Sequence, residues 1–272
     1  MSNKYIFVFF TAIILFLSSS TASAITFTSF GPHGEGGQLH GQNFQIGADG
    51  KVIELDAYLN IAGEDLNGPA VFGTSAQLSL DPLPAGLDFS FNPMLSADSK
   101  DLTLRYTFVN KTGTDIKKIT FLSFLDVDIG ASSFSEYVTT NGSPAPGENY
   151  EVNTPAGNFP TIFDNLLLGT LTGTNAFPNS SQTGDVSMAL SFLQAELPEN
   201  KSFIIDIMIS EATGSIGGFS LIQHDTASPT TVTYSGAAVV RASVPEASSF
   251  LLAGIGLLTL MGYRRKIRSS IQ

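Results

Sequence analysis

Two carboxylates lie two positions apart in the segment Leu125–Ile129, where apolar residues alternate with them. Successive side chains of a β-strand point to opposite faces, so Asp126 and Asp128 would share one face, with Cβ atoms about 6–7 Å apart. This spacing can hold one hard cation, and calcium suits a site made of oxygen ligands. Glu136 and Asp164 follow along the chain and could supply further ligands. The pattern predicts a calcium site or, alternatively, a strand whose outer face is merely polar.

The same two carboxylates meet the distance requirement of a glycosidase, which needs a pair about 5–10 Å apart with one pKa raised by burial. Any two alternating residues of a strand satisfy this distance, and the chain has no Trp to stack against a sugar. It also has no Cys nucleophile, and His224-Asp225 has no Gly-x-Ser-x-Gly segment to complete a hydrolytic triad. We therefore expect the protein not to be an enzyme, with a secreted glycan hydrolase as an alternative.

His33 and His40 flank Glu35 in a glycine-rich segment. Two imidazoles and a carboxylate can bind a metal, but this spacing matches no helix face and no zinc motif. We interpret the segment as an exposed loop. Calcium is the only cofactor that the sequence predicts.

Most of the chain between residues 25 and 243 alternates apolar and polar side chains, which is typical of strands with one buried face. The clearest runs are Ile53–Leu59, Leu102–Val109, Lys117–Ile129, Val186–Phe192, Phe203–Ile209 and Thr231–Arg241. Shorter candidates are Ile25–Phe30, Gln42–Ile46, Ala76–Leu80 and Leu87–Phe91. No amphipathic run of helical period exceeds two turns. These short strands predict an all-β fold, an antiparallel β-sandwich that is jelly-roll-like.

Two connecting segments stand out by composition. Asn110–Gly113 lies between two of the clearest runs, and since Asn and Gly accept left-handed dihedrals, we predict a hairpin there. Gly130–Pro160 has the weakest alternation and contains Asn141–Gly147, which is rich in Gly and Pro. We predict that this stretch is a surface excursion within one domain.

Composition excludes several classes of protein. The 272 residues include 13 Lys+Arg and 24 Asp+Glu, a net charge of -11, which disfavours a nucleic-acid partner because phosphate binding needs clustered cations. The absence of Cys excludes disulfides and thiolate metal sites. With 14% charged and 43% hydrophobic residues, the chain is too apolar to be disordered.

Residues 1–24 have the three parts of a secretory signal peptide. Lys4 gives a positive start, Tyr5–Leu17 is almost wholly apolar, and Ala22 and Ala24 are the small residues that signal peptidase reads. The apolar run is shorter than the ~20 residues that span a bilayer. We therefore expect export across the inner membrane and cleavage after Ala24.

The C-terminus has a second ordered pattern. Val244, Pro245 and Glu246 precede the apolar stretch Phe250–Tyr263, and four cations follow it, namely Arg264, Arg265, Lys266 and Arg268. As a helix, the residues from Ala247 to Tyr263 would rise about 25 Å, a marginal membrane span. The cations behind it would stay cytoplasmic. We expect a transmembrane-type helix with a basic tail.

This order of features resembles the PEP-CTERM sorting signal, which occurs on exported proteins of Gram-negative bacteria that are handled by exosortase, a membrane transpeptidase-like protease. Family members usually have Pro-Glu-Pro, whereas this chain has Ala247 in the third position. The resemblance covers residues 244–272 and implies recognition near Pro245-Glu246, release of the helix, and transfer to the cell surface or matrix. Many such proteins accompany exopolysaccharide production and biofilm formation.

The sequence thus predicts a signal peptide at 1–24, an exported β-sandwich domain at 25–243 and a sorting signal at 244–272. The expected function is that of a non-enzymatic surface or extracellular-matrix protein, with a glycan-binding module as the main alternative. Its expected partners are signal peptidase, an exosortase-like enzyme, the inner membrane during sorting, and exopolysaccharide.

Overall fold

The computed structural model describes residues 45–242, except residue 48 and residues 62–69, 73–82, 131–133, 155–161 and 212. The signal peptide with Ala22 and Ala24, the segment with His33 and His40, and the whole sorting signal at 244–272 lie outside the described residues, as do the predicted strands Ile25–Phe30 and Ala76–Leu80. In the part of the chain that the structure describes, no helix is long and apolar enough to cross a membrane.

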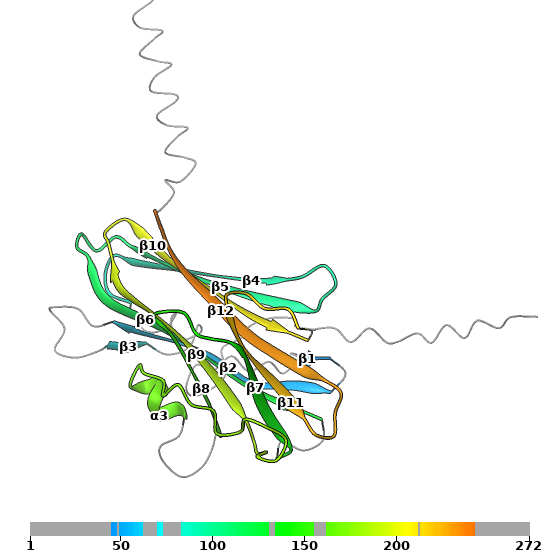
Figure 1. Ribbon diagram of the computed structural model, residues 1–272. Helices are drawn as coiled ribbons and strands as arrows, with labels where there is room; N and C mark the ends of the chain where they lie inside the picture. The colour runs from blue at the N-terminus through cyan, green and yellow to red at the C-terminus, as the bar shows by residue number, and fades with distance from the viewer. Residues whose placement is uncertain are drawn as a thin grey trace, which may run out of the picture.

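Strands make up nearly all of the regular structure (Figure 1). In chain order they are β1 (Gln45–Ile46), β2 (Gly50–Ile61), β3 (Ala70–Phe72), β4 (Leu87–Leu95), β5 (Asp101–Asn110), β6 (Ile116–Ile129), β7 (Glu136–Gly142), β8 (Glu148–Asn153), β9 (Ser187–Leu197), β10 (Lys201–Ser210), β11 (Phe219–Asp225) and β12 (Thr231–Ala242). One short helix, α3 (Ile162–Leu167), lies between β8 and β9.

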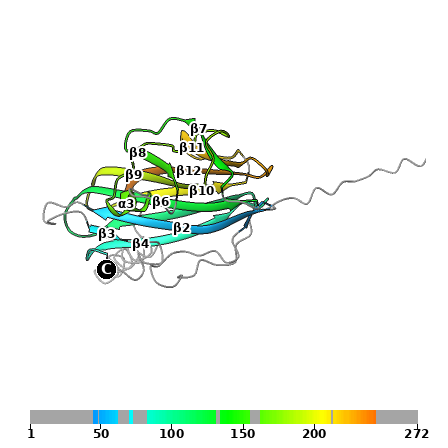
Figure 2. The same cartoon turned by 90° about the horizontal axis from the view of Figure 1, so that it is seen from below.

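The strands form two antiparallel sheets that pack as a sandwich (Figure 2). The first sheet has the order β1-β2-β6-β9-β8, with β3 also paired to β2. The second sheet has the order β4-β5-β10-β12-β11-β7. The antiparallel β-sandwich predicted from alternation is therefore confirmed.

The main core lies between the two sheets. The inward residues of β6 are those expected from the sequence, Ile119, Phe121, Leu125, Val127 and Ile129, and all are fully buried. They meet β5 of the other sheet, where the ring of Tyr106 lies 4.6 Å from that of Phe121, centroid to centroid. Aromatic pairs at such distances add to the stabilisation from buried area.

The hairpin predicted at Asn110–Gly113 is wrong. β5 pairs with β4 and β10, and β6 pairs with β2 and β9, so the segment carries the chain from one sheet to the other. The crossing is fixed by Asn110, whose side-chain amide donates to the carbonyls of Thr114 and Leu197, 2.8 Å each. Alternation had assigned the right faces to β5 and β6, which face each other across the core rather than lying side by side.

The interpretation of Gly130–Pro160 as a surface excursion is also wrong, because this stretch contains β7 and β8. β7 pairs with β11 at one edge of the second sheet, and β8 pairs with β9 at an edge of the first. Edge strands need only one hydrogen-bonding neighbour, and their sequences alternate less clearly because both faces are partly polar. The residues 143–147 between them carry the chain across the sandwich.

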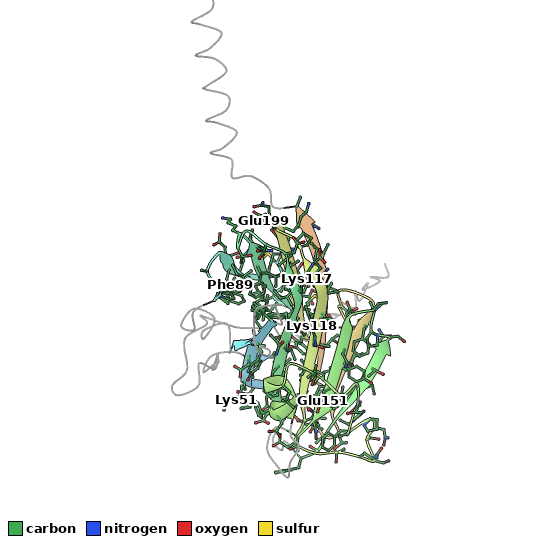
Figure 3. All side chains as sticks on the ribbon, turned by 90° about the vertical axis from the view of Figure 1, so that its left-hand side faces the viewer. Lys51, Phe89, Lys117, Lys118, Glu151 and Glu199 are labelled. Atoms are coloured by element: carbon green, nitrogen blue, oxygen red, sulfur yellow. The ribbon has the colours of Figure 1, made fainter. Side chains whose placement is uncertain are left out.

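α3 covers part of the outer face of the first sheet, the face turned away from the second sheet. Ile162 and Leu166 of α3 pack with Leu122 and Phe124 of β6 and with Tyr58 of β2 in a second, smaller apolar cluster. Glu151 of β8, beside α3 in Figure 3, holds the helix in place by accepting from the amide of Asn165 at 2.9 Å. As a result, residues on the outer face of β6 that would otherwise be exposed become buried.

Candidate metal centre

Three carboxylates converge at the end of β6 on the outer face of the first sheet. Asp126 and Asp128 extend from the same face of β6, as the sequence predicts, and Asp185 stands just before β9. Asp126 is opposite Ser187 in the register of β6 and β9, and continuing that register by two residues puts Asp185 opposite Asp128. One carboxylate oxygen from each residue lies within 4.8 Å of the others. These three residues form the carboxylate cluster.

Asp126 is the buried member of the cluster. Its residue is only 6% exposed, and its Oδ1 atom is buried without accepting a hydrogen bond from any described residue. A buried carboxylate oxygen with no donor carries a large desolvation cost. A proton or a bound cation would remove that cost, whereas a neighbouring carboxylate increases it.

The electrostatics of the cluster reflect this crowding. Burial, followed by the charges of Asp185 and Asp128, raises the pKa of Asp126 to about 7. Burial also raises the pKa of Asp128, although Lys51 partly opposes the shift. Lys51, labelled in Figure 3, is the β2 residue paired with Asp128. The pKa of Asp185 is raised by burial and by Asp128. Burial is the largest cause of all three shifts, and neighbouring carboxylates add to those of Asp126 and Asp185, so a cation would favour the ionised forms.

Glu136 lies beside the cluster but belongs to β7 of the second sheet. It is fully buried, and its Oε1 atom accepts a hydrogen bond from the backbone N–H of Ile129 at 2.6 Å. Burial raises the pKa of Glu136 to about 9, the backbone N–H groups oppose that shift, and the charges of Asp128 and Asp126 add to it. Glu136 therefore links the end of β6 to the second sheet, and its pKa depends on the charge of the carboxylate cluster.

Other acids on the same outer face have structural partners. Both oxygens of Glu151 accept from Asn165, and one also accepts from the N–H of Thr172 at 3.1 Å. Asp56 accepts from the hydroxyl of Tyr58 at 3.1 Å. Asn165 and Thr172 thus account for both oxygens of Glu151, and Tyr58 accounts for the Oδ2 atom of Asp56. What sets the carboxylate cluster apart is the convergence of three acidic side chains.

This arrangement suits a hard cation. The ligand atoms are all carboxylate oxygens, which calcium prefers, and their separation allows a single ion to contact all three. Three carboxylates do not complete the six to eight ligands that calcium takes, so water would supply the remainder.

The sequence had suggested two further ligands for Asp126 and Asp128. Glu136 is close enough to couple electrostatically with both. Asp164, in contrast, lies in the first turn of α3 and is not part of the carboxylate cluster. Asp185 was missed, because it follows a glycine and precedes a strand, and only the pairing of β6 with β9 brings it to Asp128.

His224 and Asp225 do not form a hydrolytic triad with Ser135, the serine that contacts Asp225. His224 stacks on Tyr137, with ring centroids 4.9 Å apart, and its Nε2 atom is 3.0 Å from the hydroxyl of Thr139. Asp225 instead accepts from the hydroxyl of Ser135 and from the N–H of Ala227. Because neighbouring residues of a strand point to opposite faces, His224 and Asp225 serve different environments.

Comparison with known proteins identifies the C-terminus. Residues 243–266 match the PEP-CTERM protein-sorting motif. The match includes Val244, Pro245, Glu246 and Lys266 and ends before Arg268. The chain therefore carries a signal for exosortase-type sorting to the cell envelope. No curated protein and no solved structure matches the chain.

Proposed function

We propose that the protein is a non-enzymatic component of the cell surface or extracellular matrix whose exported β-sandwich binds calcium. The observation that carries the calcium proposal is the carboxylate cluster, in which a buried oxygen of Asp126 has no donor among the described residues. The sorting motif supports the location, because it directs the chain to the envelope. Exported modules meet calcium at concentrations that suit sites with dissociation constants of about 10⁻⁴–10⁻³ M.

Calorimetric titration of the full-length protein in detergent tests this proposal. We expect calcium to bind with a dissociation constant of about 10⁻⁴–10⁻³ M, and magnesium to bind more weakly because it gives up its water reluctantly. Asp126→Asn should abolish the calcium signal. The matched control is Asp88→Asn, because Asp88 is an exposed acid on β4 whose carboxylate is paired with Lys111 at 2.6 Å. Equal calcium binding by the two variants, or none by the parent protein, would refute the site.

The association with matrix and exopolysaccharide is a separate part of the proposal and rests on the sorting motif. Its test is the fractionation of the native cells into membrane, surface and medium, with the intact mass of the protein measured in each. We expect a processed protein without Arg264–Arg268 at the surface or in the matrix. A protein found only in the inner membrane, with those residues still attached, would contradict this part and leave the calcium site untouched.

The proposed absence of catalysis is supported by composition, because the chain has no Trp to stack against a sugar and no Cys nucleophile. Assaying the parent protein and Asp126→Asn against a panel of polysaccharides tests it directly. We expect no release of reducing ends by either protein. Turnover by the parent that Asp126→Asn loses, with the fold retained, would make the protein a glycan hydrolase instead.

A further inference from the structure

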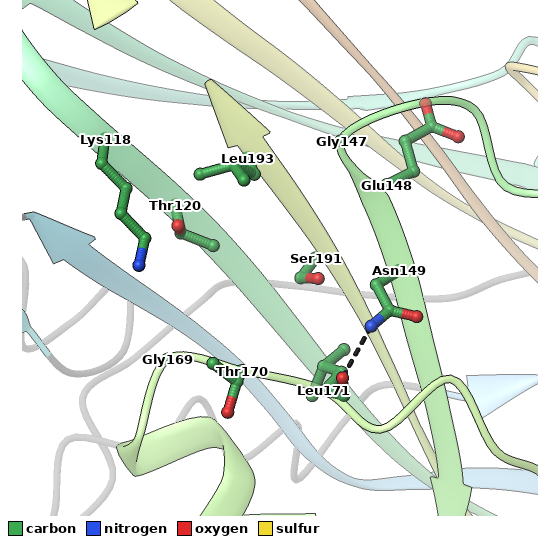
Figure 4. A pocket seen from close by; sticks show the side chains of 10 residues that line it. All are labelled: Lys118, Thr120, Gly147, Glu148, Asn149, Gly169, Thr170, Leu171, Ser191 and Leu193. Atoms are coloured by element: carbon green, nitrogen blue, oxygen red, sulfur yellow. Dashed lines mark hydrogen bonds between the residues drawn. The ribbon is translucent and has the colours of Figure 1, made fainter. Parts of the chain in front are cut away.

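A pocket lies on the outer face of the first sheet, away from the carboxylate cluster. It has a volume of about 310 Å³ and lies over β6 and β9 (Figure 4). The turn at Gly147 and the loop at Gly169–Leu171 form its sides. A volume of this size is at the lower end for small-molecule sites, which fits one small unit rather than a large ligand. We call it the Lys118 pocket.

Glycine at two positions gives the Lys118 pocket its shape. Gly147 has a φ of +88°, and a Cβ atom there would come within 2.7 Å of the carbonyl oxygen of Leu193. Gly169 has a φ of +70°, and its Cβ atom would overlap the side chain of Asn60. Both positions favour Gly, because side chains rarely adopt these dihedrals. The two sides of the pocket are thus held close to the sheet.

Two side-chain hydroxyl groups at the bottom of the pocket are available for hydrogen bonds. Thr120 of β6 and Ser191 of β9 are each only 6% exposed, and both line the pocket (Figure 4). Neither hydroxyl has a hydrogen bond to another described residue. Asn149, by contrast, is engaged, because its amide donates to the carbonyl of Leu171 at 2.6 Å. The hydroxyls of Thr120 and Ser191 can therefore exchange water for a partner supplied by a ligand.

Lys118 supplies the positive charge of the pocket. Its φ is +52°, a strained value for a residue with a side chain, and such strain clusters at functional sites. Lys118 forms no ion pair within the described residues, whereas its neighbour Lys117 pairs with Glu196 at 2.5 Å. Glu148 also lines the pocket, but its carboxylate accepts from the N–H of Ala145 at 3.0 Å and points away in Figure 4. A negative group on a ligand would therefore meet an available cation.

Apolar surface completes the pocket. Leu193 lines it and is 43% exposed, and Leu171 lines the opposite side. Leu168, which is 66% exposed, directly precedes the Gly169–Leu171 loop. The site thus combines two hydroxyl groups, one ammonium group and the aliphatic side chains of Leu171 and Leu193. A sugar ring presents the matching features, namely many hydroxyls and apolar C–H groups, and a carboxylate on the ring would pair with the ammonium group.

We propose that the Lys118 pocket binds a carboxylate-bearing saccharide unit, a uronate. The ring hydroxyls bond to Thr120 and Ser191, the carboxylate accepts from Lys118, and the C–H groups lie against Leu193. This inference does not depend on calcium binding, because the pocket shares no residue with the carboxylate cluster.

A matched pair of ligands tests this proposal on the full-length protein in detergent, with EDTA present to keep the carboxylate cluster empty. Methyl glucuronide and methyl glucoside differ only by a carboxylate in place of a hydroxymethyl group, and methyl galacturonide and mannuronide cover the other ring stereochemistries. Ligand-observed NMR titration measures each affinity. We expect at least one uronide to bind at least about tenfold more tightly than the neutral glycoside, the usual effect of a charge-assisted hydrogen bond.

Three variants show which residues carry the effect. Lys118→Met should remove the preference for the uronide, since Met has a similar length and no charge. Lys100→Met, which removes a cation from the loop before β5 in the other sheet, should retain it. Ser191→Ala should weaken the binding of the uronide and of the neutral glycoside by similar factors. Binding of no uronide, or a preference that survives Lys118→Met, would overturn the proposal, and circular dichroism checks that each variant is folded.

Discussion

Replacing Asp126 with Asn should stabilise the protein when calcium is absent, and calcium should remove much of that difference. The pKa of the Asp126 carboxyl rises from 3.8 to about 7 on folding, so the folded chain holds this proton more tightly than the unfolded chain. Below about pH 4 both states are protonated and the carboxyl has no effect. Between about pH 4 and pH 7 the unfolded carboxyl ionises first, so stability falls. Above about pH 7 the loss is complete and amounts to about 4 kcal/mol.

Asn has the shape of Asp without the charge, so Asp126→Asn escapes this loss. In EDTA at about pH 8, we expect the free energy of unfolding of the variant to exceed that of the parent by up to about 4 kcal/mol. Calcium should narrow this difference. At a free concentration of about ten to one hundred times the dissociation constant, binding adds about 1.5–3 kcal/mol to the parent and nothing to the variant.

Urea unfolding of full-length protein in detergent, followed by circular dichroism, measures both effects. The control, Asp88→Asn, removes an exposed carboxylate paired with Lys111, and should change stability by less than about 1 kcal/mol at any pH or calcium concentration. The reasoning fails if Asp126→Asn is less stable than the parent in EDTA at high pH. It also fails if calcium stabilises the parent and Asp126→Asn equally.

Three other perturbations follow from the fold and are measured by urea unfolding, and a fourth follows from the sorting motif. Gly142→Ala should cost more than about 2 kcal/mol, because its φ is +79° and a Cβ would overlap the carbonyl of Gly218, whereas Gly218→Ala, with open space around it, should cost under about 1 kcal/mol. Asn110→Ala should cost about 2–4 kcal/mol, since two buried carbonyls lose their donor. Lys118→Gly should add about 1 kcal/mol by relieving the strain at φ +52°, and no gain would mean that the backbone is not strained. Glu246→Gln should block processing, so that the intact mass in native cells keeps the C-terminal cations, and normal processing would contradict that role.

The sequence predicts which face of the sheet each residue of a strand occupies, but it does not predict which strands lie next to each other. Alternation in β6 correctly assigned Phe121 and Leu125 to the core and Asp126 and Asp128 to the other face. Pairing depends on contacts between distant segments, which a period of two does not encode. For this reason Asp185 could not be predicted as a member of the carboxylate cluster, although its position before a strand was visible.

Burial of the outer face was the second property that the sequence concealed. α3 is only six residues long, too short to show a helical period, yet it covers Leu122 and Phe124. The wrong prediction of a hairpin at Asn110–Gly113 has a related cause, because the same residue types that form tight turns also let the chain cross between sheets. In both cases local composition was compatible with two structures, and packing decided between them.

The place of β12 in the second sheet has a mechanical consequence. β12 lies between β10 and β11, and its last residue, Ala242, directly precedes the sorting signal in the sequence. A pull on the C-terminal tail along the strand axis therefore loads a strand that pairs with β10 along its last ten residues and with β11 over Thr231–Ser235. Ten residue pairs join β12 to β10, and they would be sheared together rather than peeled apart one at a time. A domain tethered through this strand would resist flow and tension better than one tethered through an edge strand such as β4 or β7.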